Sequence, residues 1–181
     1  MPTLHLSSSE ISVTVLLGAA GAVASVPLGY AGRLFSPIPL LSPILSQAIS
    51  GLHVFWIVLA ALLNRRGGTA FLTGALKGLV EAFLSSHLGL LVLTISAVEG
   101  LSAETVFYLT RKRSPCSVYF AGGFSSASNV AVLTLVLDLP HIIFALMFLS
   151  SFLSGLLFGG YLGQKVYRTL PRTIQASGPI G

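Results

Sequence analysis

Long apolar stretches separated by short polar connections recur along the 181-residue chain. Each stretch is about 20 residues long, which is the length that an α-helix needs to cross roughly 30 Å of hydrocarbon. Because the bilayer core holds no water, each stretch must satisfy its backbone hydrogen bonds internally, as a helix does. The pattern predicts an all-α integral membrane fold with six spans, at residues 11–30, 44–63, 69–86, 89–110, 116–137 and 141–163.

The composition supports a single membrane domain at residues 11–165, flanked by short segments at 1–10 and 166–181. Hydrophobic residues make up 54% of the chain and charged residues only 8%, so a soluble globular domain is excluded. The single cysteine, Cys116, excludes an intramolecular disulfide. No basic region precedes the first apolar run, and Ser7 with Glu10 instead forms the pattern of a helix-starting capping box.

Basic residues mark one side of the membrane. Eight of the ten follow the second, fourth or sixth span: Arg65, Arg66, Arg111, Lys112, Arg113, Lys165, Arg168 and Arg172. Since cytoplasmic connections carry the excess of Lys and Arg, both termini are predicted to be cytoplasmic, and the chain is predicted to be a multi-pass protein of the cell membrane. These residues form no basic face with interleaved aromatics, so nucleic-acid binding is not indicated.

The first external connection is longer than the others and holds three prolines between Arg33 and Pro43. Proline stiffens a connection, so this segment is expected to lie against the outer mouth of the bundle. It has two interpretations, a lid over a site or a plain interfacial loop.

Four acidic or basic side chains, Lys77, Glu81, Glu99 and Glu104, lie inside predicted spans, where charge is costly to bury. Lys77 and Glu81 are four residues apart and share one helix face with small residues, which mark a packed face. Glu81 lies in the outer half of the membrane, and Glu99 on the next span lies near its middle. Intramembrane carboxylates usually mark a substrate or ion path, so both are candidate substrate-binding residues, while Lys77 has the alternative interpretation of a buried counterion.

Further polar and aromatic residues occur at depths that match an outward-facing pocket. The candidates are Gln47, His53 and Trp56 on the second span, His87 at the outer end of the third, and Asn129 on the fifth. Each has the alternative role of a packing residue or an interhelical hydrogen-bond partner. Glu104 lies deeper than Glu99, and its alternative role is likewise an interhelical hydrogen bond.

Catalytic and metal-binding motifs are absent from the sequence. The run GGFSSAS, residues 122–128, lacks the G-x-S-x-G pattern and is better interpreted as a small-residue helix face. No two histidines are four residues apart on one helix, so no metal-binding motif is present. The first span carries small residues at four-residue spacing, which predicts either close packing inside the bundle or docking of another membrane subunit at Gly18, Ala20, Ala22 and Ala24.

Four runs resemble the YkoE-like substrate-binding subunits, or S components, of energy-coupling factor (ECF) transporters. They are GLVEAFL in the third span, VEGLSAETVFYLTR from Val98 to Arg111, the following AGGFSSAS, and SGLLFGGYLGQKV near the end. The resemblance implies a six-helix bundle that captures thiamine or hydroxymethylpyrimidine from outside. It also implies an A-x-x-x-A face at Ala20 and Ala24 that meets a transmembrane coupling subunit. Two ATPase subunits would use the ATP, so no cofactor is expected in this chain.

Three positions depart from the family pattern: Glu99 stands where an amide is expected, Gly74 where a carboxylate is expected, and Lys77 is atypical.

From the resemblance and the intramembrane carboxylates, we predict a binding subunit without enzymatic activity. The alternatives are a proton-coupled carrier or membrane-embedded enzyme that uses Lys77, Glu81 and Glu99, an S component for another vitamin, and a structural subunit that binds no small molecule.

Overall fold

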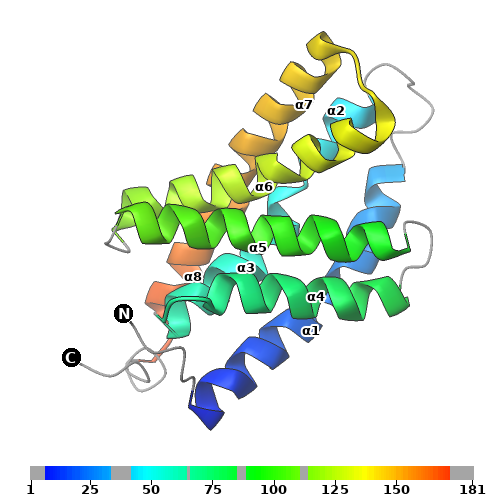
Figure 1. Ribbon diagram of the computed structural model, residues 1–181. Coiled ribbons are helices and arrows are strands. Elements are labelled where there is room, and N and C mark those ends of the chain that lie inside the picture. The colour runs from blue at the N-terminus through cyan, green and yellow to red at the C-terminus, as the bar shows by residue number, and fades with distance from the viewer. Residues whose placement is uncertain (1–6, 34–41, 65, 85–88, 111–113, 172–181) are drawn as a thin grey trace.

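The structure, a computed structural model, describes residues 7–33, 42–64, 66–84, 89–110 and 114–171. Every regular element in these ranges is helical (Figure 1). In chain order they are α1 (Ser8–Arg33), α2 (Ser42–Gln47), α3 (Gly51–Asn64), α4 (Thr69–Leu84), α5 (Leu90–Thr110), α6 (Pro115–Leu137), α7 (His141–Ser154), the π-helix η1 (Gly155–Leu162) and α8 (Gly163–Thr169). The predicted all-α fold class is confirmed.

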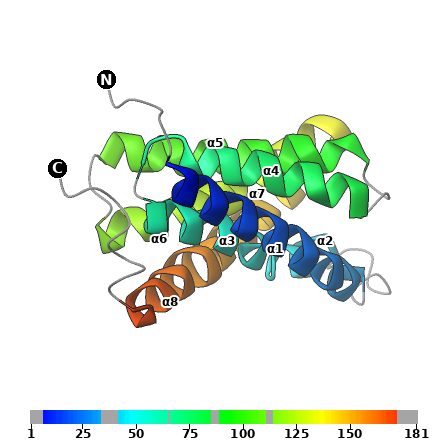
Figure 2. The same ribbon diagram turned by 90° about the horizontal axis from the view of Figure 1, so that it is seen from below.

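Five segments of the described chain are long and apolar enough to cross a membrane: Ser8–Gly32, Ser42–Asn64, Leu90–Thr110, Pro115–Leu137 and His141–Thr169. The remaining predicted span corresponds to α4, whose 16 residues extend about 24 Å at 1.5 Å per residue. This helix is shorter than the hydrocarbon core, but it lies side by side with α5 in both views (Figures 1 and 2) and completes the bundle of six.

Helix α3 forms the centre of the bundle. It is apolar all round, as expected of a helix surrounded by others, and Val54, Ile57 and Val58 are fully buried. It contacts α1, α4, α6, η1 and α8. In Figure 2, α1 runs across the face that α3 and α4 present, so one side of α1 is covered by the bundle and the other is open.

The second span is interrupted at residues 48–50, between α2 and α3. There the backbone makes i to i+3 hydrogen bonds, such as Ser50 N to the Gln47 carbonyl at 3.2 Å. Three buried hydroxyls hold the interruption in place, because Ser50 Oγ lies 2.8 Å from Ser126 Oγ and 2.9 Å from Ser151 Oγ. Since backbone groups freed from a helix need partners in a membrane, these serines explain how the break is tolerated.

Glycines allow several pairs of helices to approach closely. A Cβ at Gly74 of α4 would overlap the Ser96 carbonyl oxygen of α5, and a Cβ at Gly122 of α6 would overlap the carbonyl oxygen of Gly155 in η1. The prediction that GGFSSAS forms a small-residue packing face is therefore confirmed. The wide turns of η1 lie opposite this face, where the sequence predicted a regular helix.

The predicted capping box starts α1. Ser7 N–H donates to Glu10 Oε2 at 2.7 Å, and Glu10 N–H donates to Ser7 Oγ at 3.4 Å. Glu10 also forms an ion pair with Arg66, whose Nε lies 2.8 Å from Glu10 Oε1. The start of α1 is thereby fixed beside the connection from α3 to α4, at the end that the basic residues assign to the cytoplasm.

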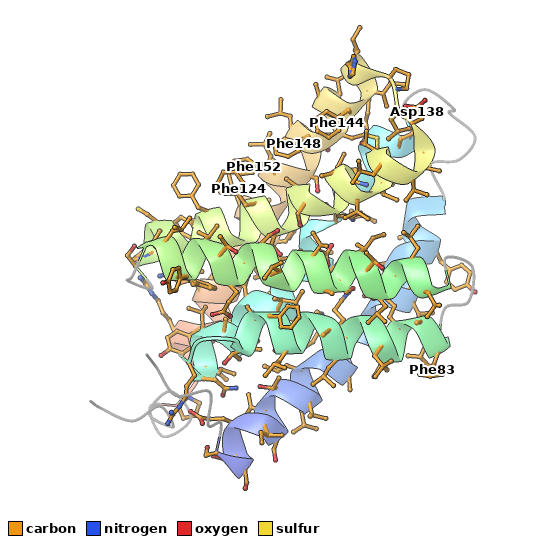
Figure 3. The ribbon with its side chains drawn as sticks, viewed as in Figure 1. Phe83, Phe124, Asp138, Phe144, Phe148 and Phe152 are labelled. Carbon is orange, nitrogen blue, oxygen red and sulfur yellow. The ribbon has the colours of Figure 1, made fainter. Side chains whose placement is uncertain are left out.

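The outer surface of the bundle is strongly apolar, as contact with lipid requires. Phe124, Phe148 and Phe152 follow one another along α6 and α7 (Figure 3), and the centroid of the Phe124 ring lies 5.1 Å from that of Phe152. Phe83 near the end of α4 is 84% exposed. Apolar exposure on this scale is unusual for a soluble monomer and normal for a protein embedded in lipid.

Candidate binding site

A cavity of about 180 Å³ lies between α1, α3, α4, α5 and α6. Its lining residues are Ser25, Gly29, His53, Lys77, Glu81, Val92, Ile95, Ser96, Glu99, Asn129 and Leu133. They occupy the second halves of α1, α4 and α6 and the first halves of α3 and α5. By the charge-based orientation these are the outer halves of the helices, so the cavity lies on the outer side of the membrane.

Lys77 and Glu81 form a buried ion pair in the cavity wall. Lys77 Nζ donates to Glu81 Oε2 at 2.8 Å and to Ser96 Oγ of α5 at 3.1 Å. The side chains are 1% and 11% exposed, so little water screens the pair. The counterion interpretation of Lys77 is confirmed, and Glu81 lines the cavity as predicted with one oxygen occupied.

Glu99 and Asn129 also line the cavity as predicted, and both retain a free oxygen. Glu99 Oε2 and Asn129 Oδ1 are buried and have no hydrogen-bond partner among the described residues. Buried polar atoms are seldom left without partners, because an unmet hydrogen bond costs about 1–3 kcal/mol. These two oxygens are therefore the atoms of the cavity most in need of a donor.

His53 contributes a third polar position from α3. Its Nδ1 lies 2.8 Å from Ser25 Oγ, and Ser25 Oγ donates to the Gly21 carbonyl at 2.9 Å. Since the serine hydrogen is used on that carbonyl, the imidazole Nδ1–H is the donor to Ser25. In the neutral ring the other nitrogen, Nε2, is then an acceptor.

Two candidates from the second span do not reach the cavity. Trp56 packs against α1, where a Cβ at Gly21 would lie 3.0 Å from the indole, and it also contacts the ring of Phe55 edge to face. Gln47 is buried on α2, before the interruption, and is not a lining residue. Neither residue lines this cavity, because Trp56 faces α1 and Gln47 precedes the interruption, and a substrate-binding role for them stays a prediction.

Glu104 is also outside the cavity. Its Oε2 accepts a hydrogen bond from the backbone N–H of Ala70 at 3.0 Å and so caps the first turn of α4. The alternative interpretation of Glu104, an interhelical hydrogen bond, is therefore confirmed. His87 and the lid interpretation of residues 34–41 lie outside the described residues.

The small residues of α1 divide between two faces. Gly18 is buried against α4, where a Cβ would lie 3.3 Å from Leu76 Cβ, and Ala22 is fully buried. Both pack inside the bundle, so the docking prediction is wrong for them. Ala20 and Ala24 are half-buried and lie near the exposed Val23, on the open side of α1.

Several lining residues were not predicted, notably Ser25, Gly29 and Ser96. Ser96 lies three residues before Glu99, on the same face of α5. This spacing from a candidate carboxylate could have predicted Ser96 as a lining residue. Ser25 and Gly29 belong to the small-residue run of α1, where nothing in the sequence separates a cavity wall from a packing surface.

Three comparisons with known proteins find relatives of this chain. A family model described as "ABC-type cobalt transport system, permease component" matches residues 9–129. The chain is 31% identical over 140 residues to YkoE of Bacillus subtilis (strain 168), a protein named as an HMP/thiamine permease, and the alignment covers 72% of this chain and 68% of YkoE. A solved S-component of an ECF transporter superposes with a TM-score of 0.83 and 27% identity over 93% of this chain and 87% of its own.

The chain belongs to the YkoE-like family of ECF S components. It is therefore a multi-pass membrane protein of a transport system, and its family and fold are those of binding subunits and not of enzymes. The alternative of a membrane-embedded enzyme is not supported. In this S component, Lys77, Glu81 and Glu99 line the outer cavity.

Proposed function

We propose that this S component captures thiamine or its hydroxymethylpyrimidine precursor (HMP) from outside and holds the pyrimidine in the outer cavity. The observation that carries the proposal is the pair of carboxylates, Glu81 and Glu99, contributed to one outer cavity by adjacent helices. The name of the relative YkoE points to the same ligands.

The chemistry of the cavity suits these ligands. An aminopyrimidine offers N–H donors to a carboxylate, and hydrogen bonds to charged groups are the stronger kind. The cavity holds two carboxylates but one ammonium group, so a cation such as thiazolium would also be attracted. Its volume of about 180 Å³ slightly exceeds the 150 Å³ of an engineered cavity that binds benzene, which corresponds to one substituted six-membered ring.

The family description names cobalt, but the described cavity is poorly suited to a metal ion. No group of three His, Cys, Asp or Glu side chains in the described part of the chain is arranged to hold one. Moreover, the ammonium group of Lys77 occupies an oxygen of Glu81 that a metal would need. An organic ligand therefore fits these residues better.

Transport itself would require partners. A transmembrane coupling subunit would dock on the open side of α1 around Ala20 and Ala24, where small side chains permit close helix contact. Two ATPase subunits would supply the energy from ATP, and this chain would need no cofactor.

The proposal predicts that ligand binding stabilises the purified protein. In detergent, thiamine or HMP at a hundred times its dissociation constant should raise the free energy of unfolding by about 2.7 kcal/mol, because the ligand binds only the folded state. The measurement is the thermal unfolding temperature with thiamine, HMP, riboflavin or Co²⁺. A shift with riboflavin or Co²⁺ and none with the pyrimidines would contradict the proposal.

A further inference from the structure

The cavity contains two acceptor atoms whose donor has to come from elsewhere. Glu99 Oε2 on α5 and Asn129 Oδ1 on α6 are both buried, and neither has a hydrogen-bond partner in the described part of the chain. The carboxylate oxygen of Glu99 and the amide oxygen of Asn129 both accept hydrogen bonds. The empty protein therefore leaves two hydrogen bonds unmade at one site, which a ligand with two N–H groups can supply.

The packing of α5 against α6 brings the two residues to the same level. Ser125 Oγ of α6 donates to the Glu99 carbonyl of α5 at 2.7 Å. Asn129 lies one helical turn beyond Ser125, on the same face and nearer the outer end of α6. Side chains tilt toward the N-terminus of their helix, and the N-terminus of α5 is its outer end, so the Glu99 side chain extends toward the level of Asn129.

The other polar groups of the cavity are at least partly occupied. Glu81 Oε2 accepts from Lys77, and Lys77 spends two of its three ammonium hydrogens on Glu81 and Ser96. Ser25 and His53 are bonded to each other. Lys77 thus neutralises Glu81, whereas Glu99 Oε2 and Asn129 Oδ1 are the acceptors of the cavity that are buried and have no partner among the described residues.

Building on the proposed function, we propose that the exocyclic amino group of a single-ring aminopyrimidine bridges α5 and α6, donating one N–H to Glu99 Oε2 and the other to Asn129 Oδ1. A primary amino group on an aromatic ring carries two hydrogens in the plane of the ring, which suits two acceptors on neighbouring helices. An oxo group at the same ring position has no N–H and would present lone pairs to both oxygens. Asn129 and Glu99 thereby determine specificity for amino-substituted over oxo-substituted rings.

The test compares HMP with its 4-oxo counterpart by isothermal titration calorimetry on the full chain in detergent. The unaltered protein should bind HMP at least about a hundred-fold more tightly, because a site built for N–H donors rejects an analogue that lacks them. Glu99→Gln can turn its amide hydrogens toward an oxo group, and Asn129→Leu removes one acceptor. Each should reduce the amino-to-oxo preference by about ten-fold or more.

Glu104→Gln is the matched control, since it makes the same chemical change on the same helix but outside the cavity, and it should leave the preference unchanged. The comparison on the unaltered protein needs no variant, so poor folding of a variant does not prevent the test. If HMP or thiamine binds but the 4-oxo compound binds equally well, or if both cavity variants keep the full preference, the bridging role is wrong and the proposed function stands. If no pyrimidine binds the unaltered protein, the proposed function is wrong as well.

Discussion

Replacing Lys77 with methionine should lower the free energy of unfolding by about 3–5 kcal/mol, since removing one partner of a buried ion pair leaves an uncompensated charge. Lys77 is 1% exposed, and its ammonium group donates to Glu81 Oε2 at 2.8 Å, so its loss leaves that carboxylate without its counterion. Methionine has a similar length and packs well in membrane helices, so lost volume contributes little. The measurement is reversible unfolding by SDS in mixed micelles.

The double variant Lys77→Met/Glu81→Gln distinguishes the effect of an unpaired charge on stability from the effect of altered packing. It removes both charges of the pair and should regain most of the stability lost in the single variant, because no unpaired charge remains at Glu81. Equal stability of Lys77→Met and the unaltered protein would show that Lys77 and Glu81 do not form this buried pair.

Replacing Gly122 with alanine should destabilise the bundle by about 3 kcal/mol, at the upper end of what overpacking usually costs. The added Cβ would overlap the Gly155 carbonyl oxygen and would lie 2.5 Å from the backbone nitrogen of Gly160. Because the contacts are with backbone and not with flexible side chains, α6 and η1 would have to move apart.

Gly32→Ala provides the control for this substitution. There a Cβ would lie 3.6 Å from Ser46 Cβ, which is an ordinary contact, and alanine is favoured over glycine in a helix by about 0.5–1 kcal/mol. This variant should be as stable as the unaltered protein or slightly more stable in the same SDS titration. If Gly122→Ala behaved like Gly32→Ala, the close approach of α6 to η1 would be wrong.

The spans were predictable from sequence because the bilayer imposes a length and a polarity on each of them. The same holds for the helix start at Ser7 and Glu10, where the capping box is a local pattern that needs no tertiary contact. Glu81 and Glu99 were recognised because a carboxylate inside a span must have a partner or a ligand, whatever the detailed packing.

The placements that could not be predicted from the sequence share one physical cause. In a soluble protein the apolar face of a helix marks its inward side, but in a membrane both lipid and bundle accept apolar residues, so the inward face is poorly marked. The sequence indicated how deep in the membrane Trp56, Gln47 and Glu104 lie. It did not indicate in which direction around the helix axis their side chains point. The break at residues 48–50 and the wide turns of η1 interrupt two of the spans, and neither is a local sequence pattern.

By itself the sequence determined that this is a bundle of membrane helices with its basic residues on one side and ionisable groups buried in the outer half. Only the tertiary structure decided which of these groups meet: Lys77 with Glu81, Glu104 with the start of α4, and Glu99 with Asn129 around a shared cavity. The depth of a residue follows from its position along a helix. Its direction depends on the rotation of that helix against its neighbours, which is set by packing between residues far apart in the chain.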